Sequence, residues 1–322
     1  MEVVNTINNR FTMVKAIFSW LMPAVLMLGI SACNNGGDDA GSNNGRPKVV
    51  TTTGIIADAV REIADTLADV HALMGPGVDP HLYKATQGNL ADLNSATIVF
   101  YNGLHLEGKM VEALEKLGRN RKVIAVADGI DTSKLRRPAE FQGNYDPHIW
   151  FDIRIWIDAV RKIATELKAA DPAHADIYER NAAAYISRLD SLDGWVRTEI
   201  ATVPQEQRVL ITAHDAFGYF GRAYGIEVRG LQGISTVSEF GLADISSLVD
   251  MIATRRIKAV FVESSVPKRS IEAVVQGVQA RGHQVRIGGE LYSDALGANG
   301  TPEGTYIGMV SANVNTIVGA LR

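Results

Sequence analysis

Two histidines in the N-terminal half of the chain stand in loops of the kind that hold ligands in α/β proteins. His81 follows a strand predicted at residues 70–74, and prolines at positions 76 and 80 stiffen the connecting loop. His148 stands in Asp146-Pro147-His148, again a proline-braced loop, just before a helix predicted from Ile153. Ligands of open α/β sheets bind beyond the carboxyl ends of the strands, so both histidines are candidates for a binding site.

The C-terminal half supplies a histidine and a carboxylate in the same position. His214 comes directly after the strand predicted at residues 209–212, and Asp294 follows the strand predicted at 285–287 and a Gly-Gly turn. Three imidazoles and one carboxylate form a borderline-soft set of nitrogen and oxygen donors, which suits zinc or another late first-row ion. For any single histidine, a hydrogen-bonded structural role is the alternative. A metal held by all four residues would lie between two lobes, because each half of the chain supplies two of them.

Two further side chains follow predicted strands and are weaker candidates. Glu263 ends the strand predicted at residues 259–262, where its carboxylate would either hydrogen-bond a ligand imidazole or cap a helix. His105 follows the strand predicted at residues 97–101. The remaining histidines fit structural roles better, because they lie within a strand, in an exposed first helical turn and in a glycine loop; they are His71, His174 and His283.

Several other classes of protein find little support. The net charge of −4 and the pI near 6.0 give no basic footprint for nucleic acid. Gly103, Gly108 and Lys109 have the spacing of a phosphate-binding loop, but Met110 stands where magnesium coordination needs Ser or Thr. The sequence contains neither the HExxH motif of zinc proteases nor the G-x-S-x-G elbow of serine hydrolases.

The N-terminus has the features of an exported lipoprotein. Residues 16–30 form an apolar run without charge, which is short for a membrane span and suits a signal peptide. The run ends in Ile30-Ser31-Ala32-Cys33, which resembles the lipobox of bacterial lipoproteins, and Cys33 is the only cysteine. An ordinary secretory signal is the alternative. We predict a signal peptide at residues 1–32, lipidation of Cys33, and a flexible tether rich in Asn, Gly and Asp at residues 33–46.

Strand-like and helix-like segments alternate along the rest of the chain. From residue 48, short β-rich runs alternate with segments of helical period, as in parallel sheets covered by helices. The alternation stops between residues 171 and 203, where a helical pattern of roughly 28 residues begins near Asp171-Pro172 and is weakened by Gly194. We predict an α/β protein of two lobes, residues 47–170 and 204–322. Each lobe has a mainly parallel four-stranded sheet flanked by helices, and one long rigid helix joins them.

Six short segments around the candidate residues have distinctive sequences. They are GPGVDPH (75–81), YNGL (101–104), DPHIW (146–150), TAHDAFGYF (212–220), FVESS (261–265) and GGELYSD (288–294). Together they resemble the signature segments of the zinc/manganese solute-binding proteins of ABC importers, and the resemblance extends over residues 48–321. It implies two α/β lobes with metal bound in the cleft between them. It places the four ligands of the family on His81, His148, His214 and Asp294.

The resemblance also bears on the metal. In the manganese-preferring branch of the family the third ligand is a glutamate, whereas this chain has His214. Zinc-specific members often carry a His-rich acidic loop before the second ligand, and residues 128–145 contain no histidine. A third imidazole in place of a carboxylate favours zinc over manganese. We therefore expect Zn(II) as the main cargo and Mn(II) as the alternative.

The function implied by the resemblance is reversible metal capture without catalysis. The expected protein is an extracytoplasmic monomer, lipid-anchored to the cell membrane or to the periplasmic face of an envelope membrane, that delivers metal to an ABC permease and its ATPase subunit. Four protein ligands would leave no open position for an activated water. Two alternatives from other classes are a secreted zinc-dependent hydrolase that uses the three histidines with water, and a surface adhesin stabilised by metal.

Overall fold

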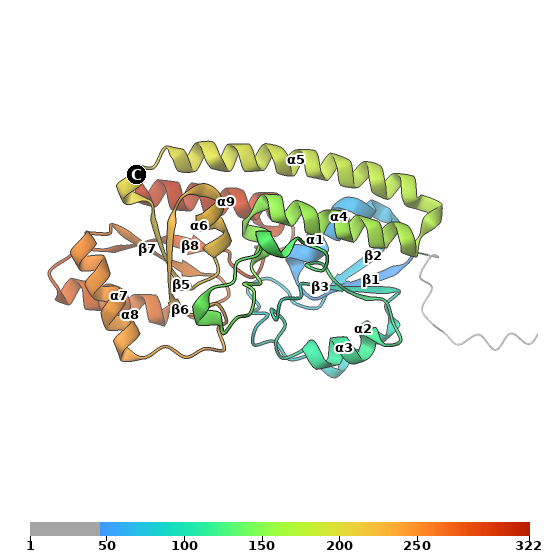
Figure 1. Cartoon of the computed structure of the whole chain (residues 1–322), viewed down its shortest axis with the longest axis horizontal. Coiled ribbons are helices and arrows are strands. Elements are labelled where there is room, and N and C mark those ends of the chain that lie inside the picture. The colour runs from blue at the N-terminus through green and yellow to red at the C-terminus, as the bar shows by residue number, and fades with distance from the viewer. Residues whose placement is uncertain (1–45) are drawn as a thin grey trace, which may run out of the picture. The chain divides into compact units, whose positions relative to one another are not determined.

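Residues 46–322 are described by the computed structural model, and within this range parallel strands and helices form two lobes (Figure 1). The predicted signal peptide, Cys33 and nearly all of the predicted tether lie outside the described residues. None of the helices between residues 46 and 322 combines the length and the apolar character that a membrane crossing requires.

The N-terminal lobe is built on a four-stranded parallel sheet of order β2-β1-β3-β4, as predicted. Strand β1 is buried on both faces, because Val49 packs toward α1 and α4 whereas Val50 packs toward α2 and α3. A short β-branched run is typical of a parallel strand covered on both sides. The strands are β1 (Lys48–Thr51), β2 (Asp69–Ala72), β3 (Ile98–Tyr101) and β4 (Val123–Ala125), and the helices are α1 (Gly54–Ala64), α2 (Gln87–Ser95), α3 (Val111–Gly118) and α4 (Ile153–Ala170).

The C-terminal lobe also has four parallel strands, but they form two hydrogen-bonded pairs, β5 with β6 and β7 with β8. The single four-stranded sheet predicted for this lobe is therefore corrected to two pairs, with β5 lying beside β7. At the carboxyl end of β5, the backbone N–H of His214 donates to the side chain of Glu263 and not to a carbonyl of β7. The strands are β5 (Val209–His214), β6 (Glu227–Gln232), β7 (Ala259–Glu263) and β8 (Arg286–Leu291), and the helices are α6 (Gly218–Tyr224), α7 (Leu242–Arg255), α8 (Arg269–Ala280) and α9 (Tyr306–Leu321).

Helix α5 (Ala175–Ala201) runs without a break for 27 residues along both lobes (Figure 1). Tyr185, Leu189 and Val196 are fully buried on the face that packs against α1, α4 and α9. Gly194 is exposed and does not interrupt the helix. The structure therefore confirms the predicted long helix that joins the lobes.

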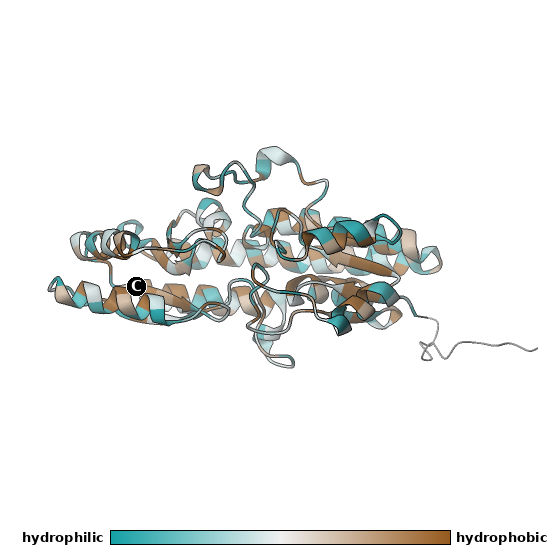
Figure 2. Ribbon diagram, turned by 90° about the horizontal axis from the view of Figure 1, so that it is seen from below, coloured by the Kyte–Doolittle hydropathy of each residue, from teal (hydrophilic) through white to brown (hydrophobic). Residues whose placement is uncertain are grey.

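One apolar core continues from the N-terminal lobe into the C-terminal lobe beneath α5. Ile56 and Trp156 of the first lobe belong to the same buried cluster as Phe217 of the second. Tyr306, the first residue of α9, donates its hydroxyl to the carbonyl of Trp150 at 2.6 Å. Figure 2 shows the apolar residues on the strands and on the inward faces of the helices. Moving the lobes apart would expose this shared core to water, which is unfavourable.

Three elements differ from the sequence expectations. The structure contains strand β6 and helix α2, which the sequence did not predict, although α2 has a capping box between Thr86 and Asn89. The sequence pattern predicts a helix over residues 311–321, whereas α9 begins at Tyr306, after Thr305, whose side chain accepts the N–H of Gly308. Polar and glycine-containing sequences hide β6 and α2, because the apolar periodicity that predicts secondary structure is weak in them.

Candidate metal centre

The four candidate ligands lie together between the lobes. His81 follows β2, His148 precedes the helical turn Ile149–Phe151, His214 is the last residue of β5, and Asp294 follows β8. One ligand atom from each residue lies within 4.8 Å of the others. The exposed fraction of each residue is 1% or 0%. The structure thus brings the predicted residues into one buried group, and their role as metal ligands remains a prediction.

The carboxylate of Asp294 lies at the centre of this group. Its Oδ2 is 3.3 Å from Nε2 of His214 and 3.7 Å from Nε2 of His81, while its Oδ1 is 3.4 Å from Nε2 of His148. Both carboxylate oxygens and His214 Nε2 are buried without a hydrogen-bond partner among the described residues. Buried polar atoms without partners are costly. A cation bound by these atoms would remove that cost, so the donor set fits a metal ion.

The same tripeptide, Asp-Pro-His, positions the first two histidines. The backbone N–H of His81 donates to Asp79 Oδ1 at 2.8 Å, and that of His148 donates to Asp146 Oδ1 at 3.0 Å. Asp146 Oδ1 also accepts from Nδ1 of His148 at 2.8 Å, whereas Nδ1 of His81 has no hydrogen-bond partner in the described part of the chain. One imidazole is therefore oriented through its ring and its backbone, and the other through its backbone.

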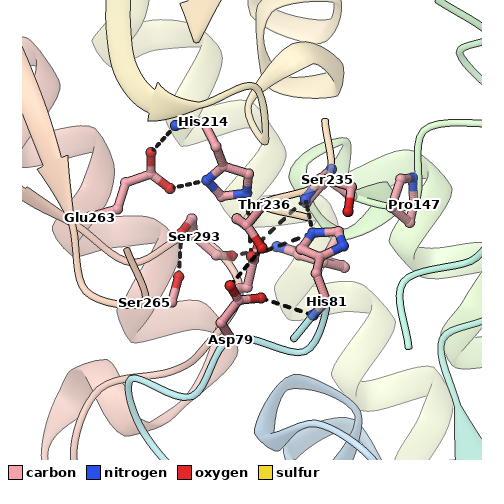
Figure 3. Close-up of polar contacts among 12 residues, drawn as sticks. Asp79, His81, Pro147, His214, Ser235, Thr236, Glu263, Ser265 and Ser293 are labelled. Carbon is pink, nitrogen blue, oxygen red and sulfur yellow. Dashed lines mark hydrogen bonds and ion pairs between the residues drawn. The ribbon is translucent and has the colours of Figure 1, made fainter. Parts of the chain in front are cut away.

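Glu263, the last residue of β7, holds His214 from two directions (Figure 3). Its Oε1 accepts the backbone N–H of His214 at 2.8 Å, and its Oε2 lies 2.6 Å from Nδ1 of the imidazole. Glu263 is 1% exposed. Of the two roles predicted for this residue, contact with the imidazole is the one that the structure contains. A carboxylate at Nδ1 fixes the ring so that Nε2 faces Asp294.

Burial and ion pairs shift the pKa values of the three histidines and Asp294 in opposite directions. Burial lowers the pKa of His81 to about 3. Burial also disfavours the charged form of His148, but the hydrogen bond to Asp146 and the nearby negative charge of Asp294 outweigh it and raise the pKa to about 9. For His214, two neighbouring carboxylates likewise overcome burial and raise the pKa well above its usual value. Burial raises the pKa of Asp294, yet His214 and His148 hold it well below its usual range. These ion pairs therefore favour the protonated forms of His148 and His214 and the ionised form of Asp294.

Helix α6 of the C-terminal lobe steadies the loop that carries His148. Tyr219 donates its hydroxyl to the carbonyl of Asp146 at 2.9 Å, and Arg136 forms an ion pair with the Asp146 carboxylate. The guanidinium of Arg136 crosses the first residue of α6, Gly218, where a Cβ atom would overlap it. A side chain at position 218 would therefore displace the guanidinium that pairs with Asp146.

The N-terminal lobe supports the same loop through a buried acid. Asn102 donates its side-chain amide to the carbonyl of Pro147 at 3.0 Å. Glu107 is 1% exposed and accepts from the backbone N–H of Asn102 and from the hydroxyl of Thr52, both at 2.7 Å. Burial raises the pKa of Glu107 above its usual value. These contacts explain how the segment after β3 fixes the position of Pro147 and hence of the histidine that follows.

One candidate from the sequence lies outside the buried group, and three residues that support the group were not predicted from the sequence. His105 is exposed in a turn, with a φ of 65°, and does not belong to the buried group. Asp79 and Asp146 were not singled out from the sequence for a role, although the repeated Asp-Pro-His tripeptide was a signal for both. Thr236 was also missed; it contacts Asp79 from 157 positions away, and no local pattern marks such a contact.

Comparisons with known proteins agree in the family that they indicate. A family model described as ZnuA, zinc-uptake complex component A, periplasmic, matches residues 49–320. The chain is 52% identical over 303 residues to the manganese-binding lipoprotein MntA of Bacillus subtilis (strain 168), covering 94% of this chain and 99% of the relative. It is 50% identical over 286 residues to the zinc-binding protein TroA of Treponema pallidum (strain Nichols), covering 89% and 92%.

The fold has a close counterpart among solved structures. The periplasmic zinc-binding protein TroA from Treponema pallidum superposes with a TM-score of 0.84 at 50% sequence identity, covering 86% of this chain and 99% of that one. The shared region includes both lobes and the long helix. The comparison therefore confirms the predicted α/β class, with parallel sheets flanked by helices.

Proposed function

Because the chain belongs to the ZnuA family of periplasmic zinc-uptake components, we propose that it is the extracytoplasmic substrate-binding component of an ABC importer for Zn(II) or Mn(II). The observation that carries this proposal is the convergence of three imidazoles and one carboxylate in a buried position between the lobes. The metal is the cargo, which the protein binds and releases unchanged.

His81, His148, His214 and Asp294 are the proposed ligands. The carboxylates beside His148 and His214 keep the proton on Nδ1, which leaves Nε2 free to bind the metal. Four protein ligands complete a tetrahedral zinc sphere and leave no position for an activated water. The centre therefore suits reversible binding better than hydrolysis, and we propose that the protein is not an enzyme.

Zinc is the ion that we expect this centre to bind more tightly. Relatives of nearly equal identity are named for different metals, manganese in Bacillus subtilis and zinc in Treponema pallidum. Affinity of a site with nitrogen and oxygen donors is greater for zinc than for manganese in general, and imidazole suits zinc well. Availability decides in vivo loading among ions that the site accepts, so manganese remains the alternative cargo.

The N-terminal features indicate where the protein acts. A lipid on Cys33 would hold the chain at the membrane, and the Asn-, Gly- and Asp-rich residues that follow would form a flexible tether. We propose that the monomeric protein delivers its metal to an ABC permease and its ATPase subunit. The relative MntA is itself named a lipoprotein.

Metal analysis of the purified protein tests this function. The protein is equilibrated with zinc and manganese at buffered free concentrations, and its metal content is measured by elemental analysis. We expect one bound ion per chain, with zinc displacing manganese at equal free concentrations. Absence of stoichiometric binding of either ion would contradict the proposal.

Hydrolytic assays separate the enzyme alternative from transport. A zinc hydrolase would turn over ester, peptide or phosphate substrates and lose that turnover in the His214→Ala variant. A binding protein shows no metal-dependent turnover, while cells that lack it take up less radioactive zinc at low external concentration. Turnover that depends on His214 would identify the protein as a hydrolase.

A further inference from the structure

The metal centre is closed in the conformation described. Its four ligand residues are at most 1% exposed, so an ion reaches them after some part of the protein moves. The apolar core beneath α5 belongs to both lobes, which makes wide separation of the lobes unfavourable. Opening should therefore occur where a segment near the centre is held by the weakest contacts.

Contacts that join the lobes around the centre differ in burial. Tyr219 and Trp150 donate to backbone carbonyls across the lobes, and these side chains are 0% and 2% exposed. A third contact lies at the edge, where the hydroxyl of Thr236 donates to Asp79 Oδ2 at 2.6 Å (Figure 3). Thr236 is 9% exposed, and the next residue, Val237, is 49% exposed. The edge contact can break with less loss of apolar burial than the two core contacts.

Thr236 belongs to the segment between β6 and α7, residues 233–241, which contains turns and no strand or helix. The hydrogen bond from Thr236 to Asp79 joins this segment to the N-terminal lobe. At its base, Ile234 is 2% exposed and anchors the segment in the C-terminal lobe. The exposed part that follows can thus move about a fixed base when the contact with Asp79 is lost.

A chain of contacts joins this segment to two of the proposed ligands. Gln232 lies opposite His214 in the β5–β6 ladder, and its side-chain amide donates to the carbonyl of Thr236 at 2.6 Å. The other end of the chain is Asp79, whose Oδ1 accepts the backbone N–H of His81 at 2.8 Å. One carboxylate therefore holds both the backbone of a ligand from the N-terminal lobe and a segment that belongs to the C-terminal lobe.

We infer that residues 235–240 form a latch over the metal centre, and that the Thr236–Asp79 hydrogen bond sets the rate at which metal enters and leaves. This inference rests on the proposed function, because it assigns a kinetic role at the same centre. Thr236 is a positioning residue in this mechanism. Its hydroxyl donates to Asp79 and acts on His81 through that carboxylate. Breaking the contact speeds capture and release together, and the coordinating atoms stay in place.

The variant Thr236→Val tests the latch, because it removes the hydroxyl and keeps the shape of the side chain. Thr236→Ser restores a hydroxyl, and Ser238→Ala removes one from an exposed position of the same segment. Zinc-loaded protein is mixed with a large excess of a chromophoric chelator, and the dissociation rate is read from the absorbance. The association rate and the equilibrium affinity are measured on the same samples, and thermal unfolding checks that each variant is folded.

We expect zinc to leave the Thr236→Val variant about ten- to a hundredfold faster than the wild type, the factor expected for loss of a hydrogen bond to a charged group. The association rate should rise with it, so that affinity changes less than about threefold. Thr236→Ser and Ser238→Ala should behave like the wild type. An unchanged dissociation rate in Thr236→Val, or a faster rate matched by an equal loss of affinity, would overturn the latch. Failure of the wild type to bind zinc would instead overturn the proposed function.

Discussion

His81 and His148 follow the same two residues, Asp and Pro, yet their pKa values are shifted in opposite directions. Both aspartates accept the backbone N–H of their histidine, so the local turn is the same. The difference arises at Nδ1, which contacts Asp146 in one case and has no hydrogen-bond partner among the described residues in the other. Burial then dominates for His81 and lowers its pKa, while ion pairing dominates for His148. Chemistry at the residue scale is thus set by tertiary neighbours as much as by sequence.

At the same scale, replacing Glu263 tests how much the orienting carboxylate contributes to binding. In Glu263→Gln, one carbonyl oxygen replaces the two carboxylate oxygens, so the side chain can no longer both accept the backbone N–H of His214 and place a negatively charged oxygen at Nδ1. We expect zinc affinity to fall about 10- to 100-fold, measured by chelator competition. Glu290→Gln, at an exposed residue paired with Lys268, should leave affinity unchanged. Wild-type affinity in Glu263→Gln would show that the carboxylate does not orient the ligand.

Proton release on binding is a further residue-scale prediction. The raised pKa of His148, about 9, means that metal displaces its proton near neutral pH. Zinc affinity should therefore rise at least about tenfold per pH unit between pH 6.5 and 9. In the metal-free protein, the stabilisation from this raised pKa is complete below pH 6.5 and is lost as the pH rises through 9. Calorimetric titrations in buffers of different ionisation enthalpy measure the released protons, and pH-independent binding would contradict this.

Elements with strong apolar periodicity were predictable, and polar ones were not. Helix α5 follows from the spacing of Tyr185, Leu189 and Val196, all of which are buried. Strand β6 was not predictable, because Glu227, Arg229 and Gly230 interrupt its apolar residues. This segment is a strand because it pairs with β5, which its local sequence does not indicate. The positions of the proposed ligands that follow strands, His81, His214 and Asp294, were readable for the same reason as the strands themselves.

Gly194 gives a prediction that belongs to helix α5. The residue is exposed in the helix interior, and no atom lies within 4 Å of the place that a Cβ would occupy. Gly194→Ala should therefore raise the free energy of unfolding by about 0.5–1 kcal/mol, because alanine loses less backbone freedom on folding. Urea unfolding of the metal-free protein measures the change, and zinc affinity should stay as in the wild type. A less stable variant would show that the helix needs glycine at this position.

At the scale of the whole molecule, the centre exists because segments distant in sequence meet between two lobes that share a core. Asp294 contacts histidines from both lobes, and Thr236 contacts Asp79 across 157 positions. Position in the sequence made the four residues a candidate set, and the family resemblance independently pointed to the same four. The contacts of Asp79 with Thr236 required the packed structure, because nothing in either local sequence encodes the other.

Asp58 tests the shared core through pH. It is 8% exposed and accepts the backbone N–H of Tyr306 at 3.0 Å, which joins α1 to α9. Burial raises the pKa of Asp58 from 3.8 to about 6, so the folded state favours the protonated carboxyl. The stabilisation of the fold by this raised pKa is complete below pH 3.8 and is lost as the pH rises through 6. Relative to the wild type, Asp58→Asn should be more stable at pH 8 than at pH 4.5, by about 2 kcal/mol. Urea unfolding of both metal-free proteins measures this difference, and equal effects at the two pH values would contradict it.

Zinc binding by four single variants, His81→Ala, His148→Ala, His214→Ala and Asp294→Ala, tests the four-residue centre most directly. The affinity of each is measured by chelator competition, with thermal unfolding to confirm the fold and His105→Ala as a control at an exposed histidine. We expect the zinc affinity of each of the four variants to fall by more than about 100-fold, which exceeds the loss expected for an orienting carboxylate. His105→Ala should bind zinc like the wild type. Wild-type zinc affinity in any of the four variants would show that the metal is held elsewhere.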